Sequence, residues 1–385
     1  MAVQRKLRVG MVGGGGPSNF FGGPHRAAIL MDNNAELTAG ALRRDPQGAI
    51  EEAERLHFTR GYSDYQTMFR EESALPAGQR IDYVTVVTPN NTHYEVAKAA
   101  LEAGFPVLCE KPLTFTLVQS KDLVRLADAS GLPFVVAYTY TAFPMVMLAR
   151  EMVKRGDIGE VRKVEAWYPQ GWLATRLEDT GMQQVAWRVD PSVAGQSNCG
   201  GDIGTHAYEF CKFVAGCSAV QVQARMPRML PGRVLDDDFS VFARLDNGGI
   251  ATFTASQITV GAMNDNGFRV IGSKGRVEWS MMDFINLYFY DLEGPMRVYR
   301  MGGDPVPPII GQYQRLPGGH PEGFHEALAN LHKTIQMQIR RRNGEDVAEP
   351  YPFPGVHDGA AGIAFIEACV KSSSADGAWT AVEQV

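Results

Sequence analysis

The stretch RVGMVGGGGP at residues 8–17 decides the fold prediction for this chain. Its first half is apolar and extends a run that begins at Leu7, which is typical of a buried strand. The glycines that follow permit positive φ angles and let the main chain approach a bound pyrophosphate closely. A helix after such a turn presents unpaired N–H groups to an anion. Because the turn directly follows the first strand, it predicts the start of a βαβ unit that binds a dinucleotide.

The glycine turn departs from the usual GxGxxG pattern. Gly13 and Gly15 hold the first two glycine positions, but Ser18 stands at the third, and residues 19–24 (NFFGGP) intervene before a helix expected at His25. A plain tight turn is the alternative interpretation. The residues expected to contact the dinucleotide here are Gly13, Gly15, Gly16, Pro17 and Ser18.

The chain up to residue 142 alternates short apolar runs with helical patterns. The runs are continuous, as in strands buried on both faces of a parallel sheet. Further strands are predicted over residues 37–42, 83–88, 106–110 and 134–140, and helices over 93–103 and 117–130. These helices end beside Gly104 and Gly131, and glycine is a common helix stop. The pattern predicts a doubly wound α/β (Rossmann) domain over residues 1–142.

Residues 143–385 follow a different pattern and predict a separate α+β domain. Strands are predicted over 161–168, 219–226, 239–245, 250–258, 268–271, 276–280 and 287–292. The turns DNGG at 246–249 and GSKG at 272–275 predict antiparallel hairpins, and hence a large, mostly antiparallel sheet. Late helices are expected near 322–342 and 358–373, and the last could pack back on the first domain.

Composition narrows the class of protein. The 385 residues, 45% of them apolar, are enough for two cores. No apolar run approaches the roughly 18 residues of a membrane span, and the first residues lack the pattern of a secretion signal. The net charge of −6 argues against a nucleic-acid partner. The basic cluster RRR at 340–342 is expected at a solvated helix end, which the helix dipole favours.

The five cysteines are odd in number and lack C-x-x-C spacing. This pattern predicts reduced thiols in a cytoplasmic enzyme and no metal site.

The end of the second predicted strand bears on the choice between NAD and NADP. An acidic residue there would bind the adenosine ribose of NAD, but the segment holds Arg43 and Arg44. An arginine could accommodate the 2′-phosphate of NADP, or it could stack on the adenine or face solvent. The next acid, Asp45, precedes a proline and could simply cap a helix.

Three further motifs accompany the glycine turn: VTPNNTH at 87–93, CEKPL at 109–113 and GDIGTH at 201–206. Together the four motifs resemble the glucose-fructose oxidoreductase, inositol dehydrogenase and MocA (Gfo/Idh/MocA) family along the whole chain. The resemblance implies a Rossmann domain, a second domain whose sheet pairs subunits into a homotetramer or homodimer, and oxidation of a small polyol or sugar.

Three other segments resemble one subgroup of that family. They are WLA at 172–174, AWR at 186–188 and GHPEG at 319–323. The subgroup contains scyllo-inositol and glucose-type sugar dehydrogenases and is similar to levoglucosan dehydrogenases and glycoside 3-dehydrogenases. Its members usually prefer NAD, whereas Arg43 would favour NADP; we expect NAD.

His206 is the candidate general base, because histidine titrates near neutral pH. The apolar stripe of its helix comprises Ile203, Ala207, Phe210, Cys211 and Val214. His206 and Asp202, four residues apart, share a strip at the edge of that stripe, which could face a cleft. Asp202 would orient the base and accept hydrogen bonds from substrate hydroxyls. The alternatives are an ordinary surface or core histidine and an aspartate that compensates the helix dipole.

Lys111 follows a parallel strand, at the sheet edge where ligands bind in open α/β folds. Its ammonium could donate to the reacting oxygen and stabilise developing negative charge. Pro112 restricts the local backbone, and Glu110 could contact the cofactor ribose or pair with Lys111. A solvated lysine at a strand end is the alternative.

Other candidates rest on position alone. Cofactor contacts are expected from Thr88, Pro89, Asn90 and His93, with Arg43, Arg44, Glu110 and Lys111. His93 could equally be an ordinary first-turn helix residue. Substrate contacts are expected from Lys111, Tyr140, Trp172, Arg176, Trp187, Arg188, Asp202, His206 and His320. Aromatic faces pack on sugar C–H surfaces and arginines donate to hydroxyls, although most tryptophans are simply core. His320 lies in a loop rich in proline and glycine, and such loops often carry function.

The sequence thus predicts a cytoplasmic NAD(P)-dependent dehydrogenase that converts a ring CH–OH of a cyclic polyol or pyranose to a ketone. One alternative is a redox-assisted glycosidase or glycoside 3-dehydrogenase that retains a tightly bound NAD. Another is a non-catalytic sensor of sugar or dinucleotide, which the presence of both Lys111 and His206 disfavours.

Overall fold

A computed structural model describes most of the chain. The described residues are 5–16, 19–182, 185 and 188–385. They form two compact units: unit 1 is Met1–Thr139 with Phe324–Gly359, and unit 2 is Tyr140–Gly323 with Ala360–Val385.

This division differs from the boundary expected at residue 142. The late segment 324–359 belongs to unit 1 because helix α11 (Phe324–Arg342) packs against α1 (Gly22–Leu30). Helix α12 (Val356–Ser374) passes from unit 1 into unit 2 at Ala360. Its Phe365 stacks on Tyr208 in unit 2 at 4.0 Å between ring centroids.

Unit 1 contains a sheet with the strand order β3-β2-β1-β4-β5-β6 across its described residues. The strands are β1 (Leu7–Gly13), β2 (Ala35–Ala41), β3 (Arg60–Gly61), β4 (Tyr83–Val87), β5 (Val107–Cys109) and β6 (Phe134–Val136). All neighbouring strands run parallel. Both central strands, β1 and β4, are almost entirely buried, which explains their continuous apolar sequence. The doubly wound prediction is confirmed.

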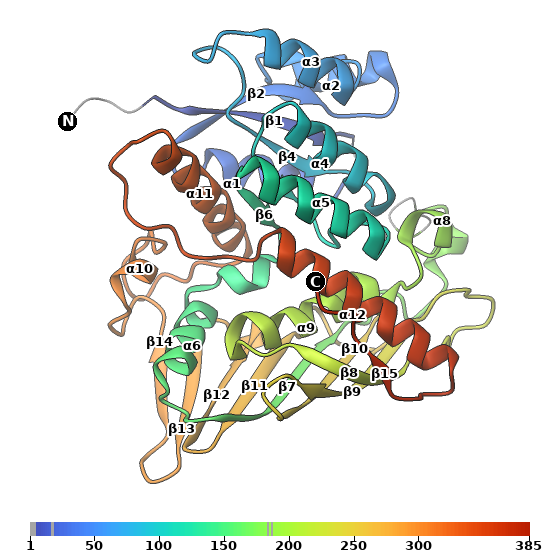
Figure 1. The fold of residues 1–385 in the computed structure, drawn as a ribbon, viewed down its shortest axis with the longest axis vertical. Helices are drawn as coiled ribbons and strands as arrows, with labels where there is room; N and C mark the ends of the chain where they lie inside the picture. The colour runs from blue at the N-terminus through green and yellow to red at the C-terminus, as the bar shows by residue number, and fades with distance from the viewer. Residues whose placement is uncertain (1–4, 17–18, 183–184, 186–187) are drawn as a thin grey trace. The chain divides into compact units, whose positions relative to one another are not determined.

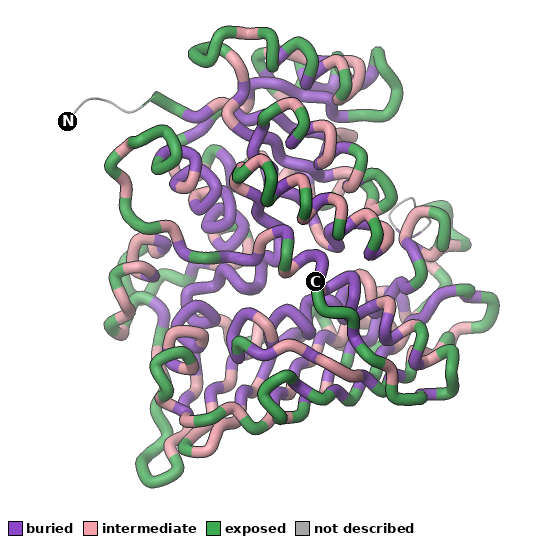
Figure 2. The backbone as a smooth tube through the Cα atoms, in the orientation of Figure 1, coloured by how far each residue is buried: buried purple, intermediate pink, exposed green. Residues whose placement is uncertain are grey.

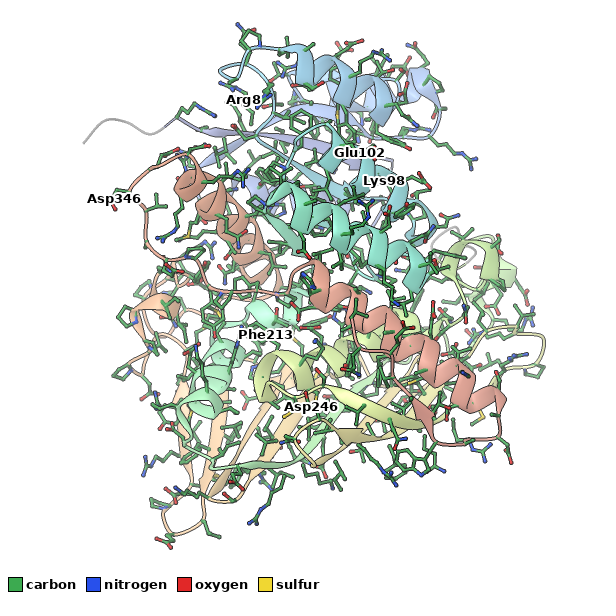
Figure 3. All side chains as sticks on the ribbon, in the orientation of Figure 1. Arg8, Lys98, Glu102, Phe213, Asp246 and Asp346 are labelled. Atoms are coloured by element: carbon green, nitrogen blue, oxygen red, sulfur yellow. The ribbon has the colours of Figure 1, made fainter. Side chains whose placement is uncertain are left out.

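The remaining helices of unit 1 are α2 (Pro46–Arg55), α3 (Tyr65–Ala74), α4 (His93–Glu102) and α5 (Leu117–Ser130). Figure 1 shows α4 and α5 side by side, and Lys98, labelled in Figure 3, reaches from α4 to Asp122 on α5 at 3.4 Å. Thr116 and Gln119 form a reciprocal capping box at the start of α5, and Gly131 ends that helix with φ 59°.

Two element boundaries and the solvation of one basic cluster differ from the sequence predictions. Helix α1 begins at Gly22 rather than His25. Strand β6 stops at Val136, because the chain turns into a 3₁₀ segment over Thr139–Ala142 instead of continuing to Tyr140. The RRR cluster is only partly solvated: Arg340 is buried and donates to Glu345 at 2.7 Å and to the Arg5 carbonyl at 2.8 Å.

Unit 2 contains a larger sheet with the strand order β14-β13-β12-β11-β7-β10-β9-β8-β15 across its described residues. The strands are β7 (Val161–Pro169), β8 (Ala219–Arg225), β9 (Asp238–Leu245), β10 (Ile250–Ser256), β11 (Gly267–Gly272), β12 (Gly275–Ser280), β13 (Asn286–Asp291), β14 (Arg297–Arg300) and β15 (Thr380–Ala381). Neighbours are antiparallel except β7 and β10, which run parallel. Both predicted hairpin turns join antiparallel strands, and Asp246 in Figure 3 marks the first.

One face of this sheet is buried. Along β9 the side chains of Phe239, Val241 and Ala243 are buried while Phe242 is 62% exposed, and Figure 2 shows such alternation along the strands. Among its described residues, unit 2 also contains the helices α6 (Pro144–Arg155), α8 (Pro191–Ala194), α9 (Thr205–Phe210) and α10 (Pro308–Gly311). Figure 1 shows α6, α9 and α12 over the sheet. In the described part of the chain, no helix combines the length and apolar character needed to span a bilayer.

Candidate active site

The glycine turn follows β1 at the point where the strand order of unit 1 reverses, which is where ligands bind in this kind of sheet. Gly13, Gly14 and Gly16 have φ angles of 76°, 77° and 81°. A Cβ on Gly13 would lie 2.4 Å from the Val87 carbonyl oxygen, and one on Gly22 would lie 1.8 Å from that of Gly14. A Cβ on Gly16 would meet nothing within 4 Å. The turn is therefore closely packed on one side and open at Gly16.

An acidic residue that the sequence analysis did not identify closes part of the turn. Glu52 of α2 accepts the Gly16 N–H at 2.9 Å and a pair of hydrogen bonds from Arg55 at 2.6 and 3.0 Å. The bonds from Arg55, reinforced by that from Gly16, lower the pKa of Glu52 to about 2. Pro17 and Ser18, which were expected to contact the dinucleotide, lie outside the described residues.

The arginines after β2 are exposed. Arg43 pairs with Asp45 at 3.2 Å, and Asp45 caps α2 by accepting the Gly48 N–H at 2.6 Å. The capping interpretation of Asp45 is thus confirmed. Arg43 and Arg44 stand where an acid would contact the ribose of NAD, and Arg43 already has an anionic partner.

The loop after β4 adjoins the glycine turn. The Oγ1 atom of Thr88 is buried and has no hydrogen-bond partner among the described residues. Pro89 is exposed and Asn90 is half-buried. His93 is fully buried at the start of α4, with Nδ1 2.8 Å from the Pro112 carbonyl and Nε2 2.9 Å from that of Thr88. Burial lowers the pKa of His93, against the effect of these carbonyls. Its ring joins the two loops, so the expected cofactor contact does not fit this position.

Glu110 and Lys111 follow β5 at the same edge of the sheet. Glu110 is buried, and its Oε2 accepts the main-chain N–H of Lys111 at 3.1 Å. Its Oε1 lies 2.9 Å from Nε2 of His25 on α1. Glu110 is therefore held from two sides, and Lys111 is half-buried beside it.

In unit 2, three rings that carry polar groups pack together. The His206 ring on α9 is edge-on to Tyr140 at 5.0 Å between centroids and lies 5.7 Å from Tyr168 at the end of β7. The hydroxyls of the two tyrosines are 2.5 Å apart, and all three residues are buried. Burial, with the neighbouring Tyr140 and the charge of Asp202, raises the pKa of the Tyr168 hydroxyl, so it stays protonated.

Asp202 lies in a π-helical turn, Gly200–Gly204, that leads into α9. Such turns often occur at functional sites. Its Oδ2 accepts from Gln257 at 3.2 Å and from Nε of Arg188 at 3.4 Å. The Arg188 guanidinium lies 5.6 Å from the ring of Trp172. These contacts join Asp202, Arg188 and Trp172, three of the predicted substrate residues.

A second set of hydrogen bonds orients the tyrosines. Trp172 donates to Gln170 at 3.0 Å, and Gln170 donates to Oδ1 of Asn264. Tyr168 also donates to this oxygen, at 3.1 Å. Because the Tyr168 proton is committed to Asn264, Tyr140 donates to Tyr168. Asn264 has a φ of 59°, a left-handed conformation that asparagine tolerates.

Some predicted substrate residues lie elsewhere. Arg176 is exposed, pairs with Asp179 at 2.7 and 3.0 Å and donates to the Pro231 carbonyl, so it braces a loop instead of joining the cluster. His320 is exposed, with Nδ1 3.3 Å from the Pro317 carbonyl. Trp187 lies outside the described residues.

The sequence analysis missed the polar residues that complete the cluster, Tyr168, Gln170, Asn198, Gln257 and Asn264. Asn198 is buried and donates to Gln257 at 2.6 Å. A usable signal was present: Tyr168 and Gln257 lie at or just after the carboxyl ends of β7 and β10, and these strands are parallel neighbours.

A doubly wound parallel sheet with an open glycine turn, followed by an α+β unit with a buried His, Asp and Arg cluster, defines a dinucleotide-dependent oxidoreductase. The chain belongs to the Gfo/Idh/MocA oxidoreductase family: residues 7–138 match its NAD-binding Rossmann domain and residues 146–278 match its C-terminal domain. The resemblance drawn from the motifs is confirmed, as are the enzyme class and the NAD-binding fold.

Relatives that align along the whole chain agree with this family assignment. An uncharacterised oxidoreductase of Bacillus subtilis, YfiI, is 34% identical over 98% of this chain and 97% of its own length. The levoglucosan dehydrogenase of Pseudarthrobacter phenanthrenivorans is 26% identical over 99% of each chain. The crystal structure of an inositol dehydrogenase homolog from Azotobacter vinelandii, complexed with NAD+, has a TM-score of 0.91 at 32% identity, covering 99% of this chain and 98% of that chain.

Proposed function

We propose that this chain is an NAD-dependent dehydrogenase that oxidises a ring secondary alcohol of a cyclic polyol or pyranose sugar to a ketone. The observation that carries the proposal is the cluster in unit 2 of the buried His206 and Arg188 with the half-buried Asp202 and Trp172. It offers a base, an acceptor, a donor and an aromatic face, which are the groups that a polyhydroxylated ring requires. Relatives named inositol 2-dehydrogenase and levoglucosan dehydrogenase support the substrate class.

The residues of unit 1 fit a dinucleotide. The open side of Gly16 leaves room for a ligand near the point where the strand order of the sheet reverses. The Oγ1 atom of Thr88, which has no partner among the described residues, offers a hydrogen-bonding group there. Gly13 to Gly16, Thr88 and Glu110 would hold the group. NAD, when bound, supplies the hydride acceptor. We favour NAD over NADP because Asp45 beside Arg43 would oppose a 2′-phosphate.

Each catalytic role follows from the chemistry of the side chain. His206 takes the proton of the reacting hydroxyl, since an imidazole exchanges protons near neutral pH. Lys111, as its place after β5 suggests, would donate to a reacting oxygen and stabilise negative charge that develops on it. Asp202 accepts from a second hydroxyl and orients the sugar ring, while Arg188 donates to its remaining hydroxyl oxygens and Trp172 packs on its C–H face.

The proposal is tested by following the absorbance of reduced nicotinamide with NAD or NADP against inositols, hexoses and glycosides. We expect turnover with NAD and at least one cyclic polyol or sugar. His206→Gln should lower kcat by roughly 10²–10⁴-fold, the usual contribution of a general base. His325→Gln, on the exposed first turn of α11, is the matched control and should stay within about twofold of the wild type.

Two results would contradict the proposal. One is the absence of NAD or NADP reduction with every polyol and sugar of the panel. The other is a His206→Gln variant as active as the wild type. Release of free aglycone from aryl glycosides without net reduction of NAD would favour the redox-assisted glycosidase instead.

We also propose a cytoplasmic, oligomeric enzyme. All five cysteines are unpaired and buried, which suits a reducing compartment. Phe242 and Ile250, 62% and 53% exposed on neighbouring strands of the unit 2 sheet, support pairing of subunits through this face. Light scattering on the purified chain would measure the mass; a monomer at micromolar concentration would contradict this part of the proposal.

A further inference from the structure

A chain of buried side chains leads away from Glu110 into the interior of unit 1. Glu110 Oε1 lies 2.9 Å from His25 Nε2, and His25 Nδ1 lies 2.9 Å from His332 Nε2. His332 Nδ1 lies 3.1 Å from the Tyr83 hydroxyl, which accepts from Gln336 Nε2 at 3.2 Å. His25, His332 and Tyr83 are fully buried. The chain links α1, β4, α11 and the loop after β5.

The donors and acceptors of this chain allow one direction when Glu110 is a carboxylate and both imidazoles are neutral. A carboxylate only accepts, so His25 carries its proton on Nε2, and its Nδ1 accepts from Nε2–H of His332. Nδ1 of His332 then accepts the Tyr83 proton, and the Tyr83 oxygen accepts from Gln336. Every link is satisfied with both imidazoles neutral. Burial places the pKa of His332 well below its usual value, which keeps that ring neutral, and burial raises the pKa of the Tyr83 hydroxyl.

Stability alone does not explain this buried network. Buried polar groups contribute little net stability compared with apolar packing, but a fully satisfied network fixes one conformation. Its end point is the residue before Lys111: one carboxylate oxygen of Glu110 meets the network, and the other accepts the Lys111 N–H at 3.1 Å. A rotation of Glu110 would break both contacts.

We propose that His25, His332 and Tyr83 are positioning residues that hold Glu110 in one rotamer and, through it, the main chain of Lys111. The proposal rests on the proposed function of Lys111. None of the three touches Lys111, so their effect on turnover is indirect. Loss of the network should lower kcat more than it raises KM, because it displaces a group needed in the transition state.

The direction of the hydrogen bonds in the network can be tested without measuring catalytic turnover. In the full chain with ¹⁵N-labelled histidine, long-range ¹H–¹⁵N spectra at neutral pH should show His25 and His332 as neutral rings protonated on Nε2, assigned by the loss of one signal each in His25→Gln and His332→Gln. A charged ring, or a proton on Nδ1 of either residue, would overturn the proposal. This result does not depend on whether the chain oxidises sugars, so it separates the two proposals.

The effect on catalysis is tested with Tyr83→Phe, which removes one hydroxyl. We expect kcat to fall about fivefold, the rate equivalent of one hydrogen bond, with KM values within about twofold. Tyr62→Phe is the matched control: it removes a buried hydroxyl that donates to Glu72 at 2.9 Å in the same unit. It should lose comparable thermal stability and keep its kcat. Equal kcat in Tyr83→Phe and Tyr62→Phe would overturn the proposal.

A second pair of variants, both at His25, keeps the proposal testable if Tyr83→Phe does not fold. His25→Gln retains a donor toward Glu110 and an acceptor toward His332, whereas His25→Leu retains neither. We expect His25→Gln to keep most of the wild-type kcat and His25→Leu to lose it, with melting temperatures recorded for both. Equal kcat in the two variants would contradict a positioning role.

Discussion

Arg188 donates from Nε to Oδ2 of Asp202 over 3.4 Å, and both side chains are largely buried, with exposures of 9% and 18%. The pairing explains how a carboxylate can stay charged inside unit 2. A buried charge without a partner is strongly destabilising, whereas a paired and hydrogen-bonded one is tolerated. Asp202 meets both conditions, because Gln257 supplies a further hydrogen bond at 3.2 Å.

Removal of the guanidinium should therefore affect both stability and activity. We predict that Arg188→Met lowers the free energy of unfolding by about 3 kcal/mol and kcat/KM for the sugar by at least about tenfold. Urea denaturation and steady-state kinetics at saturating NAD would measure the two effects.

Arg176→Met is the matched control for this prediction. Arg176 pairs with the exposed Asp179, and exposed ion pairs contribute little, so we expect a change within about 1 kcal/mol. A comparable loss of kcat/KM in both variants would argue that Arg176 belongs to the substrate site, as its sequence first indicated.

Tyr168 connects His206 to the polar residues around Asn264. Tyr168→Phe removes the donor to Asn264 and the acceptor of the Tyr140 proton. We predict that KM for the sugar rises about fivefold, because Tyr140 loses its fixed orientation, while KM for NAD is unchanged. Tyr290→Phe, a half-buried tyrosine beneath Arg276 on the unit 2 sheet, is the control. An unchanged sugar KM in Tyr168→Phe would exclude this role.

Much of the fold was readable from local sequence. Strands buried on both faces, such as β1 and β4, produce continuous apolar runs, and the capping box at Thr116 marks the start of α5. These features are encoded within about one turn or one strand, so periodicity and capping reveal them.

The rest depends on contacts between distant segments. The sequence predicted a mostly antiparallel sheet in the second domain but did not indicate which strands run parallel. The parallel pair is β7 and β10, which brings Tyr168 and Gln257 to one edge of the sheet. His25 and His332 are separated by 307 positions, and nothing near either residue indicates its partner. Short or exposed strands such as β14 bury too little apolar surface to leave a pattern.

The packing of the glycine turn suggests a matched pair of substitutions on α1, one at Gly22 and one at Gly23. A Cβ at Gly22 would lie 1.8 Å from the Gly14 carbonyl, whereas one at Gly23 would meet only the far end of Arg26 at 3.9 Å. We predict that Gly22→Ala displaces the turn and weakens NAD binding at least about tenfold. Gly23→Ala should leave NAD binding unchanged and stabilise the helix by up to about 1 kcal/mol. Titration calorimetry with NAD and thermal denaturation would decide; equal affinity in both variants would contradict the proposed location of the pyrophosphate.

Glu52 gives the turn a stability that depends on pH. Its pKa is lowered from 4.5 to about 2 by Arg55 and the Gly16 N–H, so the native state favours the charged form. The resulting stabilisation is complete above pH 4.5 and is lost as the pH falls toward 2. We predict that wild type exceeds Glu52→Gln in unfolding free energy by about 2 kcal/mol near neutral pH, and that the gap narrows below pH 4.5.

Urea denaturation from about pH 6 to about pH 3 would measure this gap. Glu51→Gln is the matched control. Glu51 is an exposed glutamate on the same helix that accepts from Gln47 at 2.8 Å, and its substitution should change stability by less than about 0.5 kcal/mol. A gap between wild type and Glu52→Gln that stays constant with pH would mean that the Glu52 charge contributes nothing and that only its shape matters. A narrowing gap would establish that the turn is held by an ionised carboxylate, which must share the Gly16 N–H with any anion bound there.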